Sequence, residues 1–123
     1  MSPCALSDQA LSRLLVEDVP FGDLTTESLG LQSRLGRLEF HARGAMTVCG
    51  VEEAVRLFEL AGASACEFVL SGAVVEDGAL LLSAEGSAAA LHRAWKTAQT
   101  LMEWASGIAS GATALVRAAA PVP

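Results

Sequence analysis

Basic residues are scarce in this sequence. Its 123 residues include 8 lysines and arginines against 14 aspartates and glutamates, which gives a formal net charge of −6 at pH 7. Lys96 is the only lysine, and no run of basic residues occurs. A nucleic-acid-binding surface needs several cations that follow the phosphates. The composition therefore argues against nucleic acid as a partner.

Long apolar runs are also missing. A membrane-spanning helix needs about 18 or more consecutive, mostly apolar residues, and the longest candidate, residues 105–116, is shorter than that. The N-terminus lacks the basic start and apolar core of a secretory signal peptide. We therefore expect a cytoplasmic protein with no membrane partner.

Motifs for metal binding, redox chemistry or nucleophilic catalysis are absent as well. Cys4, Cys49 and Cys66 lie far apart and form no CxxC pair or metal-ligand spacing, so buried or free thiols in a reducing compartment are expected. The sequence contains neither a glycine-rich phosphate loop nor a recognisable Ser/His/Asp or Cys/His arrangement. We expect no catalytic residue and no metal site in this chain.

Apolar residues, by contrast, are abundant. They make up 52% of the sequence while charged residues make up 18%, which excludes a disordered, solvated chain. The length corresponds to one domain. Much of the apolar excess is alanine, so we expect part of this surface to pack against a second copy or against a domain outside the chain.

The hydrophobic pattern predicts a small α+β domain that ends in a long helix. Ser7 is placed to cap the first helix, which must end before Pro20. Asp77-Gly78 is a strong turn signal between two strands. The predicted order is a helix over 6–18, a loop over 19–33, strands over 38–42 and 46–49, a helix over 51–61, strands over 65–70 and 79–84, and a helix over 87–119.

In the long helix, apolar residues recur at alternating steps of three and four, which is typical of a heptad seam. The residues of this predicted seam are Leu91, Ala94, Ala98, Leu101, Ala105, Ile108, Ala112 and Leu115. Gly107 and Gly111 lie four apart within it. They either allow another backbone to approach closely or mark a break between two helices.

A small carboxylate cluster surrounds the turn after the first helix. Glu17, Asp18 and Asp23 could bind a hard cation such as Mg²⁺. Alternatively, the Asp23 carboxylate accepts hydrogen bonds from the backbone amides that follow it, as in an Asx-turn. We prefer the structural interpretation, because no further ligand is evident nearby.

His92, Arg93 and Lys96 form the main candidate binding site. Steps of three and four residues place them on one face near the start of the long helix. A helix N-terminus already attracts anions, so this cationic face suits carboxylates or phosphates. The alternative is a solvated helix face that offsets nearby acids.

The remaining candidates have simpler explanations. His41 stands alone on a predicted strand, and we interpret it as a solvent-facing or core-edge side chain. Trp95 and Trp104 lie nine residues apart and point in nearly opposite directions. We interpret them as packing or interface aromatics rather than as a stacking site.

Four motifs together resemble the quinolinate phosphoribosyltransferase (nicotinate-nucleotide pyrophosphorylase) family. They are EDVPFGDLTT at 17–26, GRLEFHARGAMTVCGVEEAVRLFE at 36–59, the pattern G-x-x-V-x-x-G-x-L-L at 72–81, and TLMEWASGIAS at 100–110. The resemblance runs from about Leu11 to Val116. It implies the N-terminal domain of that family, a small open-faced α/β sandwich with a hammerhead-like fold and a long C-terminal helix.

One position departs from the family in a way that bears on substrate specificity. The enzymes usually begin the long helix with Glu-Arg, and that arginine holds the substrate's carboxylates in a neighbouring subunit's active site. This sequence has Trp95-Lys96 instead. In this respect it is similar to the ModD branch of the family, which is associated with molybdenum transport. Lysine keeps the charge but lacks the planar fork of arginine. The resemblance thus implies substrate binding by Lys96, on the cationic face that it shares by helical spacing with Arg93 and His92.

The resemblance also implies that part of the family's structure is missing. Residues 1–119 correspond to the N-terminal domain, and residues 120–123 form a tail where the family's catalytic barrel would begin. The family is a pentosyltransferase of NAD biosynthesis that uses Mg²⁺, and we expect this chain alone to be inactive and to hold no cofactor. Expected partners are a second copy in a homodimer or higher oligomer, a missing barrel domain or full-length paralogue, and an anionic small molecule.

Two alternative functions remain open. The chain could be a non-catalytic oligomerisation or accessory module, associated with molybdenum transport and left by truncation. It could also be a small carrier-like module of the biotinyl type. The carrier hypothesis is the weaker one, because no lysine lies at a predicted hairpin tip.

Overall fold

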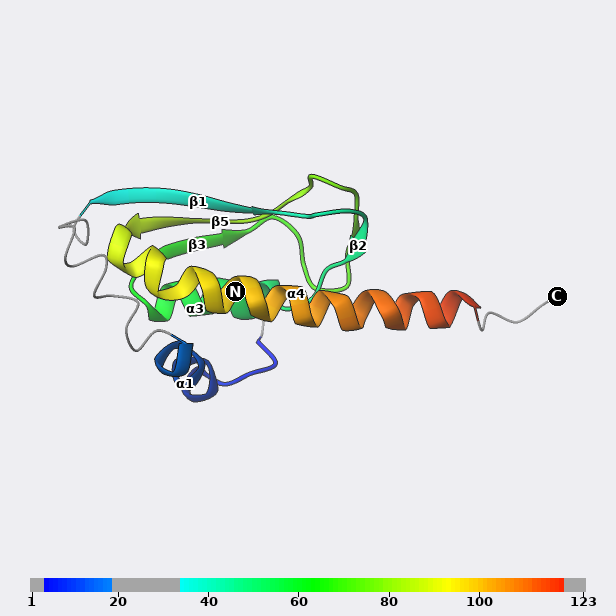
Figure 1. Cartoon of the computed structure of the whole chain (residues 1–123), viewed down its shortest axis with the longest axis horizontal. Coiled ribbons are helices and arrows are strands. Elements are labelled where there is room, and N and C mark those ends of the chain that lie inside the picture. The colour runs from blue at the N-terminus through cyan, green and yellow to red at the C-terminus, as the bar shows by residue number, and fades with distance from the viewer. Residues whose placement is uncertain (1–3, 19–33, 119–123) are drawn as a thin grey trace.

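The computed structural model describes residues 4–18 and 34–118, which form an α+β domain built around one small sheet (Figure 1). The helices are α1 (Asp8–Asp18), α3 (Val51–Leu60) and α4 (Ala88–Ala118). The strands are β1 (Leu35–His41), β2 (Met46–Thr47), β3 (Ser64–Glu67), β4 (Val74–Val75) and β5 (Leu80–Ser87).

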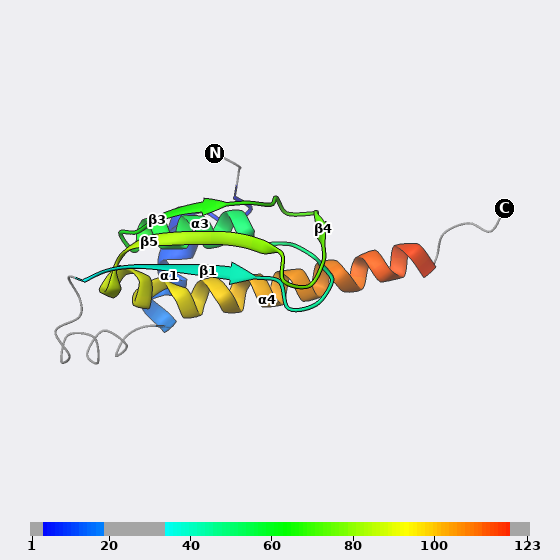
Figure 2. The same ribbon diagram turned by 90° about the horizontal axis from the view of Figure 1, so that it is seen from above.

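The strands form two antiparallel sheets. The larger has the order β1-β5-β3, and the smaller pairs β2 with β4. Helices α3 and α4 lie side by side on one face of the larger sheet, and α1 lies beyond them (Figures 1 and 2). No described element covers the other face, so the domain is an open-faced sandwich without a barrel, as the sequence predicted.

The core lies between the larger sheet and the two helices. Leu38 and Phe40 of β1 turn toward the helices and are half-buried, while the alternate residues of the strand are exposed. The Phe40 ring meets the buried Phe58 ring of α3 edge to face, with 5.9 Å between their centroids. Leu82 on β5 is fully buried in the same layer. The period-2 alternation in β1 therefore places Leu38 and Phe40 on the helix side, as predicted.

A row of hydroxyl groups joins α4 to the segment around β2. Ser106 Oγ accepts a hydrogen bond from the Cys49 amide at 2.9 Å and donates to the Cys49 carbonyl at 3.1 Å. One turn later, Ser110 Oγ accepts from the Thr47 amide, and Thr113 lies 3.0 Å from the Thr47 hydroxyl. These bonds satisfy main-chain groups at the point where the ladder of the short strand β2 ends.

The start of α3 packs closely against α4. Gly50 precedes α3 with φ of 84°, and a Cβ atom there would lie 3.3 Å from Cβ of Ala105 on α4. The Gly50 amide donates to Ser71 Oγ, and Ser71 in turn donates to the buried carboxylate of Glu52. Only glycine combines this backbone conformation with so close a helix contact.

Most predicted elements are confirmed, with corrections at three strands. Ala10 donates its amide to Ser7 Oγ, so Ser7 caps α1. The strand predicted over 46–49 comprises only Met46–Thr47. The strand predicted over 65–70 is shorter and comprises only Ser64–Glu67. The turn region between it and β5 contains a strand that the prediction missed, β4 (Val74–Val75). Two residues are too few for the alternation by which a strand is recognised in sequence.

The predicted heptad seam of α4 is buried or half-buried as far as Ala105 and exposed beyond it. Ile108 and Leu115 are 69% and 72% exposed, whereas Met102 and Ser106, which lie outside the predicted seam, are buried. A straight helix has 3.6 residues per turn, so a strict seven-residue repeat drifts around its surface. The buried face therefore passes from the predicted seam to Met102 and Ser106.

Gly107 and Gly111 do not break the helix, since α4 is continuous from Ala88 to Ala118. Within the described part of the chain, a Cβ atom at either glycine would meet nothing within 4 Å. Among residues 4–18 and 34–118, no helix is both long enough and apolar enough to cross a membrane.

We expect Ser106→Ala to lower the free energy of unfolding by about 1–3 kcal/mol, because it leaves the Cys49 amide and carbonyl without their partner. Thr100→Ala is the matched control: Thr100 is exposed on the same helix, and its removal should change stability by no more than about 0.5 kcal/mol. Urea denaturation followed by circular dichroism measures both. Equal midpoints for the two variants would show that the Ser106–Cys49 bonds do not stabilise the domain.

Candidate functional site

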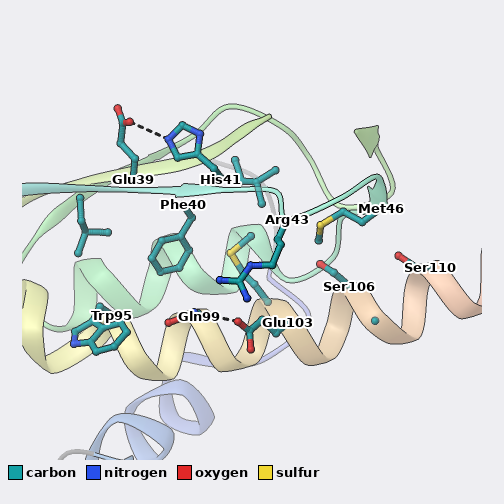
Figure 3. A pocket seen from close by; sticks show the side chains of 14 residues that line it. Glu39, Phe40, His41, Arg43, Met46, Trp95, Gln99, Glu103, Ser106 and Ser110 are labelled. Carbon is teal, nitrogen blue, oxygen red and sulfur yellow. Dashed lines mark hydrogen bonds and ion pairs between the residues drawn. The ribbon is translucent and has the colours of Figure 1, made fainter. Parts of the chain in front are cut away.

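A cleft of about 730 Å³ lies between β1 and α4 (Figure 3). Its volume falls in the range of small-molecule and peptide pockets. The lining residues come from β1 and the loop after it, from β2, β5 and α4. They are Leu38, Glu39, Phe40, His41, Arg43, Met46, Leu81, Trp95, Gln99, Met102, Glu103, Ser106, Gly107 and Ser110.

Most polar groups of the cleft are already engaged. Glu39 contacts His41 at 3.1 Å and Arg37 at 3.0 Å. On α4, the Gln99 amide group donates to the Glu103 carboxylate at 3.0 Å. The serine hydroxyls of the cleft belong to the row that binds the β2 segment. These groups shape the cleft but are largely committed to the fold.

Arg43 differs from these residues. Its side chain extends from the end of β1 toward α4, and its guanidinium group lies in the cleft (Figure 3). Within residues 4–18 and 34–118 it makes no hydrogen bond or ion pair, although Glu103 lines the same cleft. A guanidinium group offers five N–H donors suited to a carboxylate. Arg43 is therefore the cleft's available cation.

His41 is exposed, as the sequence interpretation expected, but it is not alone. Its Nδ1 lies 3.2 Å from the Gly78 carbonyl, and its Nε2 lies 3.1 Å from Oε1 of Glu39. The Gly78 carbonyl and the Glu39 carboxylate both favour the protonated ring, so the pKa of His41 is raised above its ordinary value. The ring links β1 to the turn before β5, which only the tertiary structure brings near.

The three predicted anion-binding residues lie in the first turns of α4, and none of them lines the cleft. His92 is half-buried, while Arg93 and Lys96 are exposed. Nζ of Lys96 lies 5.6 Å from the centroid of the Trp95 ring, and Trp95 does line the cleft. Lys96 thus borders the cleft without entering it, and its binding role stays a prediction.

The other candidate residues take no part in a described site. Of the carboxylate cluster, Asp23 and the side chains of Glu17 and Asp18 lie outside the described residues. Elsewhere in the described ranges, no group of three or more His, Cys, Asp or Glu side chains is placed to hold a metal ion. The three cysteines are free thiols, and Trp104 is 74% exposed.

The architecture and the sequence together define a domain class with known relatives. The chain matches the family model described as quinolinate phosphoribosyl transferase, N-terminal domain, over residues 23–106. The chain therefore belongs to this family. Since the match ends at Ser106, it includes the serine that joins α4 to Cys49.

Individual relatives agree with this assignment. A Rhodobacter capsulatus protein named as a pyrophosphorylase, ModD, is 56% identical over 117 residues, which are 95% of this chain and 45% of that protein. A Synechocystis protein named as a carboxylating nicotinate-nucleotide pyrophosphorylase is 30% identical over 100% of this chain and 42% of its own length. A crystal structure of a NadC deletion mutant superposes with a TM-score of 0.85 at 25% identity, over 96% of this chain and 45% of that one.

These comparisons place the chain nearer to the ModD protein than to the Synechocystis pyrophosphorylase. The chain spans less than half the length of these relatives. Its structure accordingly describes the N-terminal domain of a quinolinate-phosphoribosyltransferase-like, ModD-type protein.

The sequence analysis missed Arg43, Gln99 and Glu103 as cleft residues. Gln99 and Glu103 are four apart on α4, a spacing that places them on one face, but nothing in the sequence indicates which face meets β1. Arg43 follows an alternating strand and precedes Gly44, whose φ is 87°. Gly44 directly after the strand was the one feature of the sequence that indicated a turn at this point.

We expect the pKa of His41 to fall toward its ordinary value in Glu39→Gln, because the variant removes the charged partner of the ring. Since the folded-state pKa is raised, the stabilisation by His41 is present at low pH and is lost as pH rises through that pKa. NMR titration of the imidazole measures the shift. Glu85→Gln, which changes an exposed carboxylate on β5 that contacts Arg37 and not the ring, should leave the titration unchanged. Equal titration curves for both variants would contradict the assignment.

Proposed function

We propose that this chain binds an anionic substrate together with a barrel domain, as the N-terminal part of a ModD-type pyrophosphorylase. The family membership over residues 23–106 carries this proposal. In the family reaction, quinolinate and phosphoribosyl pyrophosphate give nicotinate mononucleotide, pyrophosphate and CO₂. The barrel would come from the same full-length polypeptide, from a second copy or from a full-length paralogue.

The barrel and the N-terminal domain would have different roles in this reaction. Phosphoribosyl transfer needs positioned contacts to phosphate and to the charge that develops on the leaving group. We place those contacts, and the Mg²⁺ of the family reaction, on the barrel. The N-terminal domain contributes the cationic start of α4, with Lys96 in the position where the family's enzymes usually carry an arginine.

Exposed apolar side chains on α4 support a protein–protein interface on the same helix as this cationic region. The helix extends well beyond the sheets at its C-terminal end (Figure 1). Along the second half of α4, Trp104, Ile108 and Leu115 are 74%, 69% and 72% exposed. Steps of four and seven place them on one face, which we call the α4 stripe. Exposed apolar patches of this kind mark surfaces that pack against other protein.

A different function, that of a non-catalytic oligomerisation module, draws on the same stripe. It requires self-association but no anion binding at Lys96. The two functions are therefore separated by two measurements, the affinity for an anion in the presence of a barrel and the mass of the chain alone.

We expect Lys96→Ala to weaken the binding of pyridine-2,3-dicarboxylate about tenfold to a hundredfold, because a charge-assisted hydrogen bond contributes about 1.5–3 kcal/mol. The titration is made by calorimetry on a complex of this chain with the barrel part of the Rhodobacter capsulatus ModD protein. Lys96→Arg should retain binding. The chain alone should show no turnover of this acid with phosphoribosyl pyrophosphate.

Arg13→Ala is the matched control, because it removes an exposed cation from a different helix, α1. It should leave the affinity unchanged, and neither alanine variant should alter thermal stability much, since exposed charges contribute little to folding. Equal affinities of Lys96→Ala and wild type would remove Lys96 from the site.

We expect the isolated chain to self-associate at micromolar concentration through the α4 stripe, because burial of its apolar surface favours association. Ile108→Glu should shift the chain toward the monomer by placing a charge in the stripe. Ala114→Glu adds the same charge to an exposed position off the stripe and should not. Light scattering measures the masses, and a monomeric wild type would refute the expectation.

A further inference from the structure

The cleft follows the free edge of the larger sheet. Residues 38–41, four consecutive residues of β1, all line it. Successive side chains of a strand point to opposite faces, so four neighbours share one cleft only where the cleft runs along the edge of the strand. In the order β1-β5-β3, the other edge of β1 pairs with β5. Among the described residues, none pairs with the cleft-side edge.

A free strand edge presents main-chain groups that can bind a further strand. In an antiparallel ladder, alternate residues of β1 direct their N–H and C=O groups toward β5, and the others direct theirs away from it. The outward groups face the cleft. An edge with such groups is a template on which another extended segment can add.

The wall opposite this edge suits the side chains of an added strand. Trp95 and Met102 of α4 line the cleft, with Phe40 and Met46 from the strand side. Every second side chain of a strand lying along β1 would point toward these apolar groups. The cleft therefore selects for apolar residues at alternate positions.

The charged residues of the cleft indicate which polar side chain a bound strand would carry. Glu39, Gln99 and Glu103 have partners within the cleft's own walls, whereas Arg43 has none in the described residues. Arg43 stands two residues after the end of β1, where an added strand would begin or end. An acidic side chain at that position would pair with it as a bidentate contact.

We propose that the cleft-side edge of β1 binds an extended peptide segment of another polypeptide, with alternating apolar residues and a carboxylate that pairs with Arg43. The segment adds to the sheet as a fourth strand, in the order new strand-β1-β5-β3. This proposal does not depend on which anion, if any, binds at Lys96. A small anion bound to Arg43 alone would leave the main-chain groups of β1 unused.

The test uses soluble peptides in which valine and threonine alternate, with serine and glycine at both ends. One glutamate is moved through the polar positions, and a second series carries glutamine there. NMR on the isotope-labelled chain measures affinity and the hydrogen exchange of the β1 amides. We expect the β1 amides that face the cleft to gain protection, and a glutamate peptide of the right register to bind more tightly than its glutamine counterpart.

Two pairs of variants separate the proposed contact from general effects. Arg43→Gln should weaken binding of the glutamate peptide about tenfold or more and leave that of the glutamine peptide nearly unchanged. Arg37→Gln removes the same charge from β1 outside the cleft and should have no such effect. Gly107→Gln places a side chain in the cleft and should abolish binding, whereas Gly111→Gln, outside the cleft lining, should not.

Several outcomes would overturn the proposal. Unchanged exchange of the β1 amides at saturating peptide would show that no strand is added. Displacement of the peptide by free glutamate at equal affinity would assign Arg43 to a small-anion site. Equal losses in Arg43→Gln and Arg37→Gln would reduce the effect to net charge. The wild-type chain could also bind the glutamate and glutamine peptides equally well. If the Glu103→Gln variant alone then preferred the glutamate peptide, Arg43 would be paired with Glu103 in the wild type.

Discussion

The structure depends on the way in which Ser106 holds α4 against the segment of β2. Its hydroxyl group is fully buried and bonds to both main-chain groups of Cys49, which lies 57 residues earlier in the chain. Buried main-chain groups without partners are costly, and β2 is too short to satisfy its neighbours through a sheet. The serine thus fixes the position of α4 along its axis, so that Ala105 lies next to Gly50.

That attachment explains the rest of the domain. With α4 fixed near β2, its first turns lie beside the core and its last turns extend beyond the sheets. The same placement opens the cleft between α4 and the edge of β1, and brings Trp95 and Met102 opposite Phe40. The serine of the TLMEWASGIAS motif therefore has a structural explanation: Ser106 is bonded to Cys49 and is not available as a nucleophile.

Two surfaces of α4 have different chemical characters. The side that faces β1 is narrow, partly polar and bordered by Lys96, whereas the α4 stripe is apolar and exposed. Their separation on one helix allows the domain to contact a ligand or peptide on one side and another protein surface on the other. The family match covers residues 23–106, and the chain itself spans less than half of its relatives.

The sequence alone determined the helices, the longer strands, the cap at Ser7 and the family, because these depend on neighbours within a few residues or on motifs in a fixed order. The resemblance also implies that Lys96 stands where the family usually has an arginine, which stays a prediction. Only the tertiary structure decided which face of α4 is buried, that His41 contacts Gly78, and that Arg43 lies in a cleft. Those features join residues far apart in the chain, and local periodicity carries no information about which distant faces will meet.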